Sequence, residues 1–170
     1  MKFFVFVISL LFSERALAVE HIPIKAKEVQ DLVCLSLNVY FEAGNQSMLG
    51  KEAVAEVVLN RVNNNKYPSS ICEVIFQGET YKGSSGKLIP KRYRCQFTWY
   101  CDGLSDTPKD YKAWIDSMEI SRKIIENGSR DITEGSTHYH STKVDPYWAD
   151  SLQKTVRIDD HVFYKEKDWK

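Results

Sequence analysis

Two apolar patterns with helical spacing lie in the first part of the chain. Residues 28–43 place aliphatic and aromatic side chains around most of a helix, which predicts a largely buried helix, and Gly44-Asn45 would end it. Ser47 can cap a second helix, whose valine-rich and alanine-rich face continues to about Arg61. Two buried helices joined by a short turn are therefore expected.

The rest of the chain is predicted to hold one more long helix and then extended segments. A short helical segment is expected at 71–76, whereas 77–94, with three Gly, two Ser and a Pro, predicts an irregular loop. Pro108 begins a helix expected to run to Glu126. Two β-rich stretches follow, residues 136–141 and 155–164. This order predicts an α+β fold, helices first and a small antiparallel β-sheet toward the C-terminus.

The N-terminus has the pattern of an export signal. Residues 3–12 form an apolar run broken only by a serine, and Ala16 and Ala18 supply the small residues of a signal-peptidase site. Ten apolar residues are too few to cross a hydrocarbon core of about 30 Å as a helix. We predict a signal peptide at 1–18 and a single domain at 19–170, exported to the periplasm or beyond. Two charged residues before the cleavage site leave a core helix or a retained anchor as the alternatives.

Composition and charge limit the classes of protein. The 170 residues are 43% hydrophobic and 27% charged, which is typical of one globular domain and not of a disordered chain or a membrane-spanning bundle. Basic and acidic residues balance at 23 each, so no overall field steers the chain to nucleic acid or anionic lipid. We expect no nucleic-acid partner, no membrane span after processing, and a monomer. A local basic group in the predicted loop is interpreted as solvated surface: Lys87, Lys91, Arg92 and Arg94.

The four cysteines are expected to form two disulfide bonds, because an exported chain meets an oxidising compartment. Three pairings are possible. Cys95 and Cys101 can close a short loop on each other, which would leave Cys34 with Cys72, and we favour this pairing. No C-x2-C spacing supports a zinc site instead.

Glu42 is the first candidate for chemistry. It follows Tyr40-Phe41 at the end of an apolar helix. Partial burial among aromatic rings and the negative end of the helix dipole both disfavour a charged carboxylate there. A carboxylic acid that keeps its proton near neutral pH is what a general acid for glycosidic cleavage requires. An exposed glutamate at a helix end is the competing interpretation.

Polar and aromatic residues further along could line a cleft. Residues 95–103 set three aromatic rings beside Gln96 and Thr98, a combination suited either to sugar rings or to a core around a disulfide. The pair Asn60-Arg61 interrupts the second apolar helix and is interpreted as holding a loop or pairing with an acid.

Two histidines suggest a zinc site as the alternative to a site at Glu42. His138 and His140 alternate on a predicted strand and could bind zinc if His161 or Glu134 supplied a third ligand. This spacing alone is a weak metal motif, so polar residues lining a cleft are the favoured interpretation. We expect no metal and no cofactor.

Several linked motifs resemble a known family. Residues 35–76 read LSLNVYFEAGNQSMLGKEAVAEVVLNRVNNNKYPSSICEVIF, with an aromatic-x-Glu-Ala near a Gly, then AVAEVVLNRV, Tyr-Pro and VIFQ. The segment resembles the SleB-type cell wall hydrolase family, which includes spore-cortex-lytic enzymes and Gram-negative and phage relatives. Downstream, CQFTWYCDG, THYH, DPYWADSL and HVFY are similar to the Gram-negative branch. The similarity extends from about Cys34 to Tyr164.

The resemblance implies a compact lysozyme-like fold, peptidoglycan as the substrate and Glu42 as the catalytic acid. Because some members are lytic transglycosylases, we expect cleavage between N-acetylmuramic acid and N-acetylglucosamine, with Glu42 as general acid and base. Six residues are expected to hold the glycan: Gln96, Thr98, Tyr139, His138, Tyr147 and Trp148. The alternatives are an N-acetylmuramoyl-L-alanine amidase, which could use zinc, and a peptidoglycan-binding domain without catalysis.

Overall fold

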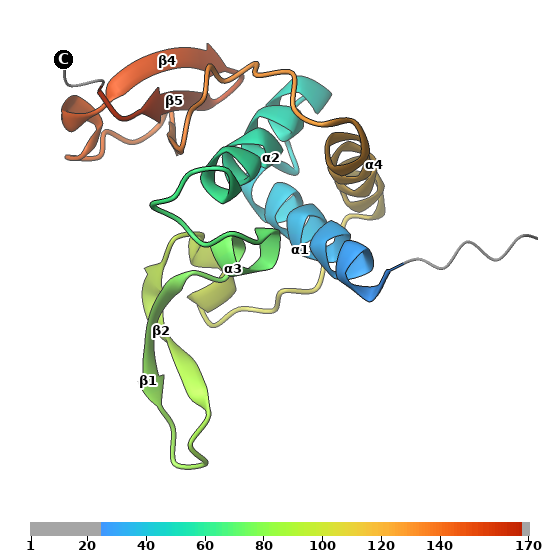
Figure 1. Ribbon diagram of the computed structural model, residues 1–170, viewed down its shortest axis with the longest axis vertical. Helices are drawn as coiled ribbons and strands as arrows, with labels where there is room; N and C mark the ends of the chain where they lie inside the picture. The colour runs from blue at the N-terminus through green and yellow to red at the C-terminus, as the bar shows by residue number, and fades with distance from the viewer. Residues whose placement is uncertain (1–24, 168–170) are drawn as a thin grey trace, which may run out of the picture.

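The computed structural model describes residues 25–167, so the predicted signal peptide lies outside the described part of the chain. Three long helices form the body of the molecule: α1 (Ala26–Ala43), α2 (Met48–Val62) and α4 (Tyr111–Asn127) (Figure 1). The helix α1 packs against both α2 and α4. From residue 25 to residue 167, no helix combines the length and apolar character needed to cross a bilayer.

The main core lies where these helices meet the short helix α3 (Ile71–Ile75) and the 3-10 helix η1 (Thr98–Cys101). Each element contributes apolar side chains that are at most 8% exposed: Leu35, Val39, Val58, Ile71, Val74, Trp99, Ile120 and Ile124. Burying one Val, Leu or Ile side chain contributes about 1.5–3 kcal/mol to folding. This core therefore fixes the end of α1, where Glu42 lies, against the other elements.

The helix ends confirm most of the predicted boundaries. The α1 helix ends at Ala43, and Ser47 caps α2 by accepting a hydrogen bond from the Gly50 amide at 3.2 Å. The predicted start of α4 at Pro108 was three residues too early. The backbone amide of Asp110 donates to the Tyr40 hydroxyl at 2.9 Å, and the Asp110 side chain caps α4 by accepting from the Ala113 amide, also at 2.9 Å.

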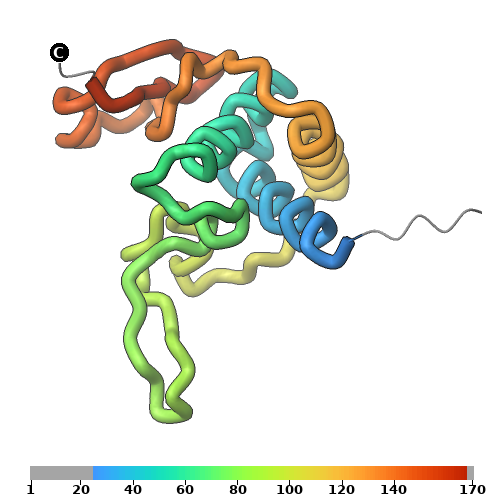
Figure 2. The backbone as a smooth tube through the Cα atoms, in the orientation of Figure 1, coloured from blue at the N-terminus to red at the C-terminus, as the bar shows by residue number. Residues whose placement is uncertain are grey.

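The irregular loop predicted at 77–94 is an antiparallel hairpin of β1 (Gly78–Lys82) and β2 (Leu88–Cys95). The hairpin projects away from the helices, as Figures 1 and 2 show. Every residue of β1 is exposed, and every residue of β2 is exposed or half-exposed. The prediction failed because a strand with no buried face lacks the apolar–polar alternation by which strands are recognised.

A second sheet lies at the end of the chain and has the order β3-β5-β4, with both pairs antiparallel: β3 (His138–Ser141), β5 (His161–Lys165) and β4 (Gln153–Ile158). The α+β prediction with a small C-terminal antiparallel sheet is confirmed. The turn between β4 and β5 docks on the start of α2, because Asp159 Oδ2 accepts from the Ser47 amide at 3.0 Å and from its hydroxyl at 2.6 Å. A Cβ atom at Gly50 would overlap this carboxylate.

Two disulfide bonds join Cys34 to Cys72 and Cys95 to Cys101, which is the pairing that the sequence favoured. The first links α1 to α3. The second joins the last residue of β2 to the last residue of η1 and so closes a loop that carries Gln96 and Thr98. The first bond therefore fixes α3 to the middle of α1, and the second stiffens the segment that packs against the end of α1 through Trp99.

Replacing both Cys95 and Cys101 by serine should lower the free energy of unfolding by about 2 kcal/mol, because the closed loop is short. Thermal unfolding under non-reducing conditions should show a fall in Tm of about 5 °C. A double variant with the Tm of the wild type would contradict a constraining role for this bond.

Candidate active site

Glu42 lies in the last turn of α1, and its carboxyl group meets the small C-terminal sheet. The Tyr139 hydroxyl, from β3, donates a hydrogen bond to Glu42 Oε2 at 3.1 Å. The preceding residue, Phe41, stacks on Trp99 with ring centroids 4.9 Å apart, and the Trp99 indole donates to Asn38 Oδ1 at 3.0 Å. Two contacts from η1 thus hold the helix turn that carries Glu42.

A pocket of about 110 Å³ opens at Glu42. Six residues line it: Glu42, Arg61, Gln96, Phe97, Thr98 and Tyr139. The structure therefore brings together four of the residues predicted for the site, from α1, β3 and the disulfide-closed loop. It also adds two side chains, those of Arg61 and Phe97, that the site prediction did not include.

Arg61 is buried and holds the pocket walls together. Its Nε donates to the Thr137 carbonyl oxygen at 2.7 Å, and its Nη1 donates to Gln96 Oε1 at 3.4 Å. The guanidinium also lies 5.2 Å from the ring centroids of both Tyr67 and Phe97, within cation–π range. Arg61 fulfils the prediction that this polar pair on α2 holds a loop.

Burial raises the pKa of Glu42 above its ordinary value. The hydrogen bond from Tyr139 and the positive charge of Arg61 act in the opposite direction, because both favour the carboxylate. Burial is the largest of the three effects, so the carboxyl group keeps its proton to higher pH than an exposed glutamate. Burial likewise raises the pKa of Tyr139 well above its ordinary value, so its hydroxyl stays a donor.

A polar stripe on α2 positions the segment that leads into β3. Glu56 is fully buried and accepts hydrogen bonds from the Ile132 amide at 3.1 Å, the Thr133 amide at 2.8 Å and the Thr133 hydroxyl at 2.6 Å. One turn later, Asn60 donates to the Ser136 carbonyl at 2.9 Å. One turn earlier, Glu52 binds Arg130. This role was not predicted, although acidic and amide residues at i, i+4 and i+8 of an apolar helix are a signal for it.

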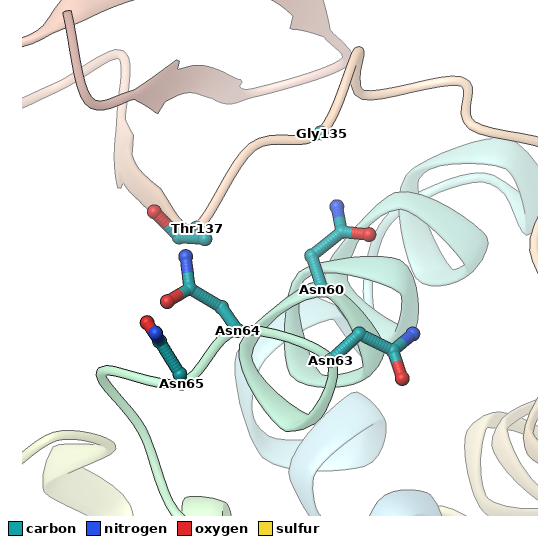
Figure 3. Close-up of a pocket in the computed structure, with 6 residues that line it drawn as sticks. All are labelled: Asn60, Asn63, Asn64, Asn65, Gly135 and Thr137. Atoms are coloured by element: carbon teal, nitrogen blue, oxygen red, sulfur yellow. The ribbon is translucent and has the colours of Figure 1, made fainter.

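A second, polar pocket of about 540 Å³ is lined in part by Thr137, the hydrogen-bond partner of Arg61. Its lining is rich in amides: Asn60, Asn63, Asn64, Asn65, Gly135 and Thr137. Asn60 and Asn64 point toward the segment that carries Gly135 and Thr137, whereas Asn63 points away (Figure 3). The hydrogen bond from Arg61 to the Thr137 carbonyl links a residue that lines the Glu42 pocket to one that lines this second pocket.

Of the remaining predicted residues, His138 and Trp148 pack together, with His140, on the other face of the sheet. Trp148 lies 5.7 Å from the His138 ring and 5.6 Å from the His140 ring, between centroids. Tyr147 is 96% exposed. None of His138, Tyr147 and Trp148 lines the pocket around Glu42. His138 faces away from it because alternate residues of β3 point to opposite faces of the sheet.

The zinc-site alternative does not assemble. His140 is engaged on both ring nitrogens, by the Ser141 carbonyl and the Tyr164 hydroxyl, each at 2.9 Å. His161, the expected third ligand, lies opposite Ser141 and packs against the rings of Tyr139 and Phe163, on the other face of the sheet. Within residues 25–167, no group of three or more His, Cys, Asp or Glu side chains could hold a metal ion.

Comparison with known proteins assigns this arrangement to a family. The model of the Cell Wall Hydrolase family matches residues 45–164, and the chain belongs to that family. The predicted class, an enzyme that degrades the bacterial cell wall, is confirmed at this level. The match begins three residues after Glu42, so it does not itself cover the proposed acid. No match was found among the curated proteins that were compared with the chain.

Two solved structures share the fold. The catalytic domain of the germination-specific lytic transglycosylase SleB from Bacillus anthracis aligns with a TM-score of 0.60 at 22% identity, covering 84% of this chain and 98% of that domain. The catalytic domain of SleB from Bacillus cereus aligns with a TM-score of 0.55 at 23% identity, covering 80% and 91%. The expected SleB-type, lysozyme-like fold is confirmed.

Proposed function

We propose that this protein is an exported lytic transglycosylase that cleaves the glycan strands of peptidoglycan, with Glu42 as its general acid and base. The observation that carries the proposal is a half-buried carboxyl group, with a raised pKa, at the wall of an open pocket. The fold shared with the B. anthracis lytic transglycosylase supports it.

The absence of a second acid in this pocket favours transglycosylation over hydrolysis. Glycosidases of the two-carboxylate type need a nucleophile about 5–5.5 Å from the acid, or a base about 6.5–9.5 Å away that activates water. Of the six described residues that line the pocket, only Glu42 carries a carboxyl group. An internal sugar hydroxyl as nucleophile removes the need for the second acid.

In the proposed reaction, Glu42 donates its proton to the oxygen that bridges muramyl C1 and the next sugar. The C1–O bond breaks, and the N-acetylglucosamine leaves with a free hydroxyl group. The Glu42 carboxylate then takes the proton of the muramyl 6-hydroxyl, whose oxygen bonds to C1. The product is a 1,6-anhydromuramyl end, Glu42 is reprotonated, and no water is consumed.

The surrounding residues would orient the acid and the sugar. Tyr139 binds Glu42 Oε2, which leaves Oε1 to carry the acid proton toward the substrate. Gln96 and Thr98, both exposed at the rim, can bind sugar hydroxyls. The amide-lined pocket beyond Thr137 can take the acetamido groups and hydroxyls of the neighbouring sugar. His138, Tyr147 and Trp148 lie outside this pocket and stay predicted outer contacts of the glycan.

Mass spectrometry of the fragments released from purified peptidoglycan tests the reaction class. Anhydromuropeptides are expected. Muropeptides with reducing ends would mean a hydrolytic muramidase, and free stem peptides with intact glycan would mean an amidase. Binding without release of fragments would mean a domain that binds peptidoglycan without cleaving it.

Replacing Tyr139 by phenylalanine should shift the alkaline limb of the pH profile of kcat/KM to higher pH. The substitution removes the hydrogen bond that stabilises the Glu42 carboxylate, so the pKa of Glu42 rises further and the active acid form persists longer. Turbidity loss of peptidoglycan suspensions across pH measures the limb. Tyr111→Phe, at a 79% exposed position, is the matched control. An alkaline limb that is unchanged or lies at lower pH would contradict the claim that Tyr139 stabilises the Glu42 carboxylate.

A further inference from the structure

The projecting hairpin concentrates positive charge beside the pocket. Residues 78–95 contain five basic residues and one acidic residue, a net charge of +4 in a chain whose formal net charge is zero. The remainder of the chain therefore carries −4. The basic residues are Lys82, Lys87, Lys91, Arg92 and Arg94, and all five are exposed.

Most of these charges are available to a ligand. Lys91 forms an ion pair with Glu79 at 3.0 Å. Within residues 25–167, no carboxylate lies within salt-bridge distance of the other four. Arg92 is held at one nitrogen only, where its Nε donates to the Asp102 carbonyl at 2.8 Å.

The hairpin has a bulge at its base that gathers three of the cations. Gly78 pairs with Cys95 and Thr80 pairs with Pro90, so residues 91–94 of β2 lie opposite Glu79 alone. Tyr93 adopts a φ of 57° there and is 60% exposed, with the Arg92 guanidinium 5.0 Å from its ring centroid. The bulge leads directly into Cys95 and then Gln96, at the rim of the Glu42 pocket.

We propose that this hairpin binds the carboxylates of the peptidoglycan stem peptides on either side of the cleaved bond. The proposal rests on the proposed function, since it names the part of the same substrate that lies outside the pocket. The five residues of β1 span about 17 Å, so the cations extend outward from the pocket rim along the strand. Stem peptides hang from the muramyl residues and carry free carboxylates, which match the charge of the hairpin.

The arrangement of side chains favours a charged polymer over a lipid bilayer. Tyr81 lies opposite Ile89 and Lys82 lies opposite Leu88, so exposed apolar groups are divided between the two faces of the hairpin. The tip is Gly83-Ser84-Ser85-Gly86, with no apolar side chain to insert. An interfacial element would instead gather its apolar residues on one face or at the tip.

Co-sedimentation of the Glu42→Gln protein with insoluble peptidoglycan tests the proposal. Native sacculi are compared with sacculi whose carboxylates have been converted to neutral amides. The variant Lys87→Gln/Arg94→Gln, in the same background, is compared with Arg122→Gln/Lys123→Gln, which removes one Arg and one Lys from the exposed surface of α4.

We expect the affinity of the parent to fall at least about threefold on amidated sacculi. The hairpin variant should bind both kinds of sacculi with this lower affinity, and the α4 variant should behave as the parent does. Equal affinity of the parent for both sacculi, or an unchanged hairpin variant, would overturn the proposal. Binding to phosphatidylglycerol vesicles that is lost in the hairpin variant, with sacculus binding unchanged, would assign the hairpin to lipid instead. If the proposed function is wrong, fragment release fails, but this binding comparison remains interpretable.

Discussion

Replacing Glu42 by glutamine should reduce the release of soluble muropeptides by about 10²–10⁴-fold, the usual contribution of a positioned acid–base group. Glutamine has nearly the same shape and can still accept the hydrogen bond from Tyr139, but it has no proton to donate to the leaving sugar. The loss should appear in kcat, with little change in binding to sacculi. Initial rates of fragment release from labelled peptidoglycan measure it.

The same variant should be more stable than the wild type at neutral pH. The pKa of Glu42 is higher in the folded protein than in the unfolded chain, so its favourable contribution is complete at acid pH and is lost as pH rises through the folded pKa. Glutamine does not ionise, so the variant does not lose this stability as pH rises. A gain in Tm at pH 7 that shrinks toward pH 4 would separate a catalytic defect from misfolding, whereas a fall in Tm at both pH values would indicate misfolding.

Replacing Glu56 by alanine should lower the free energy of unfolding by about 3–5 kcal/mol. The buried amide and hydroxyl of Thr133 and the partly buried amide of Ile132 would lose their acceptor, and each unsatisfied buried donor costs about 1–3 kcal/mol. Thermal unfolding should show a fall in Tm of about 10 °C. The segment from Ile132 leads to Thr137, the partner of Arg61. Activity should therefore also decrease at temperatures below the melting transition, where the variant is still folded.

Two matched variants test whether the lower stability of Glu56→Ala comes from the lost hydrogen bonds. Glu126→Ala, at an exposed position in the last turn of α4, should change stability by no more than about 0.5 kcal/mol. Glu56→Gln should lie between the two, since one side-chain oxygen remains to accept. If Glu56→Ala and Glu126→Ala had the same free energy of unfolding, the hydrogen bonds of Glu56 would not stabilise the segment before β3.

The elements with a buried face could be predicted from the sequence, and the exposed ones could not. The helices α1 and α2 bury apolar residues at helical spacing, and their caps carry local signals such as Ser47 and Gly44. The β1–β2 hairpin is held by backbone pairing and has no buried face, so its sequence lacks the pattern of a strand and predicts a loop. The start of α4 depends on the Tyr40 hydroxyl, which is distant in sequence.

In the candidate site, too, features that depend on local sequence could be predicted, and those that depend on tertiary contacts could not. Glu42 was accessible to sequence reasoning because a single residue at an apolar helix end has a clear physical consequence. The partners of Arg61 were not, since Thr137 and Gln96 are brought to it by the tertiary fold. The alternation of β3 also sends Tyr139 into the pocket and its two histidine neighbours to the opposite face, a separation that the list of candidates did not anticipate.

The most direct test of the central claim is digestion of peptidoglycan in water enriched in heavy oxygen, followed by mass spectrometry of the fragments. If Glu42 directs the muramyl 6-hydroxyl onto C1, the wild type should release anhydromuramyl ends that carry no heavy oxygen, and Glu42→Gln should release almost none. Reducing muramyl ends that contain one heavy oxygen would show that water is the nucleophile. That result would contradict the transglycosylase mechanism proposed for this pocket.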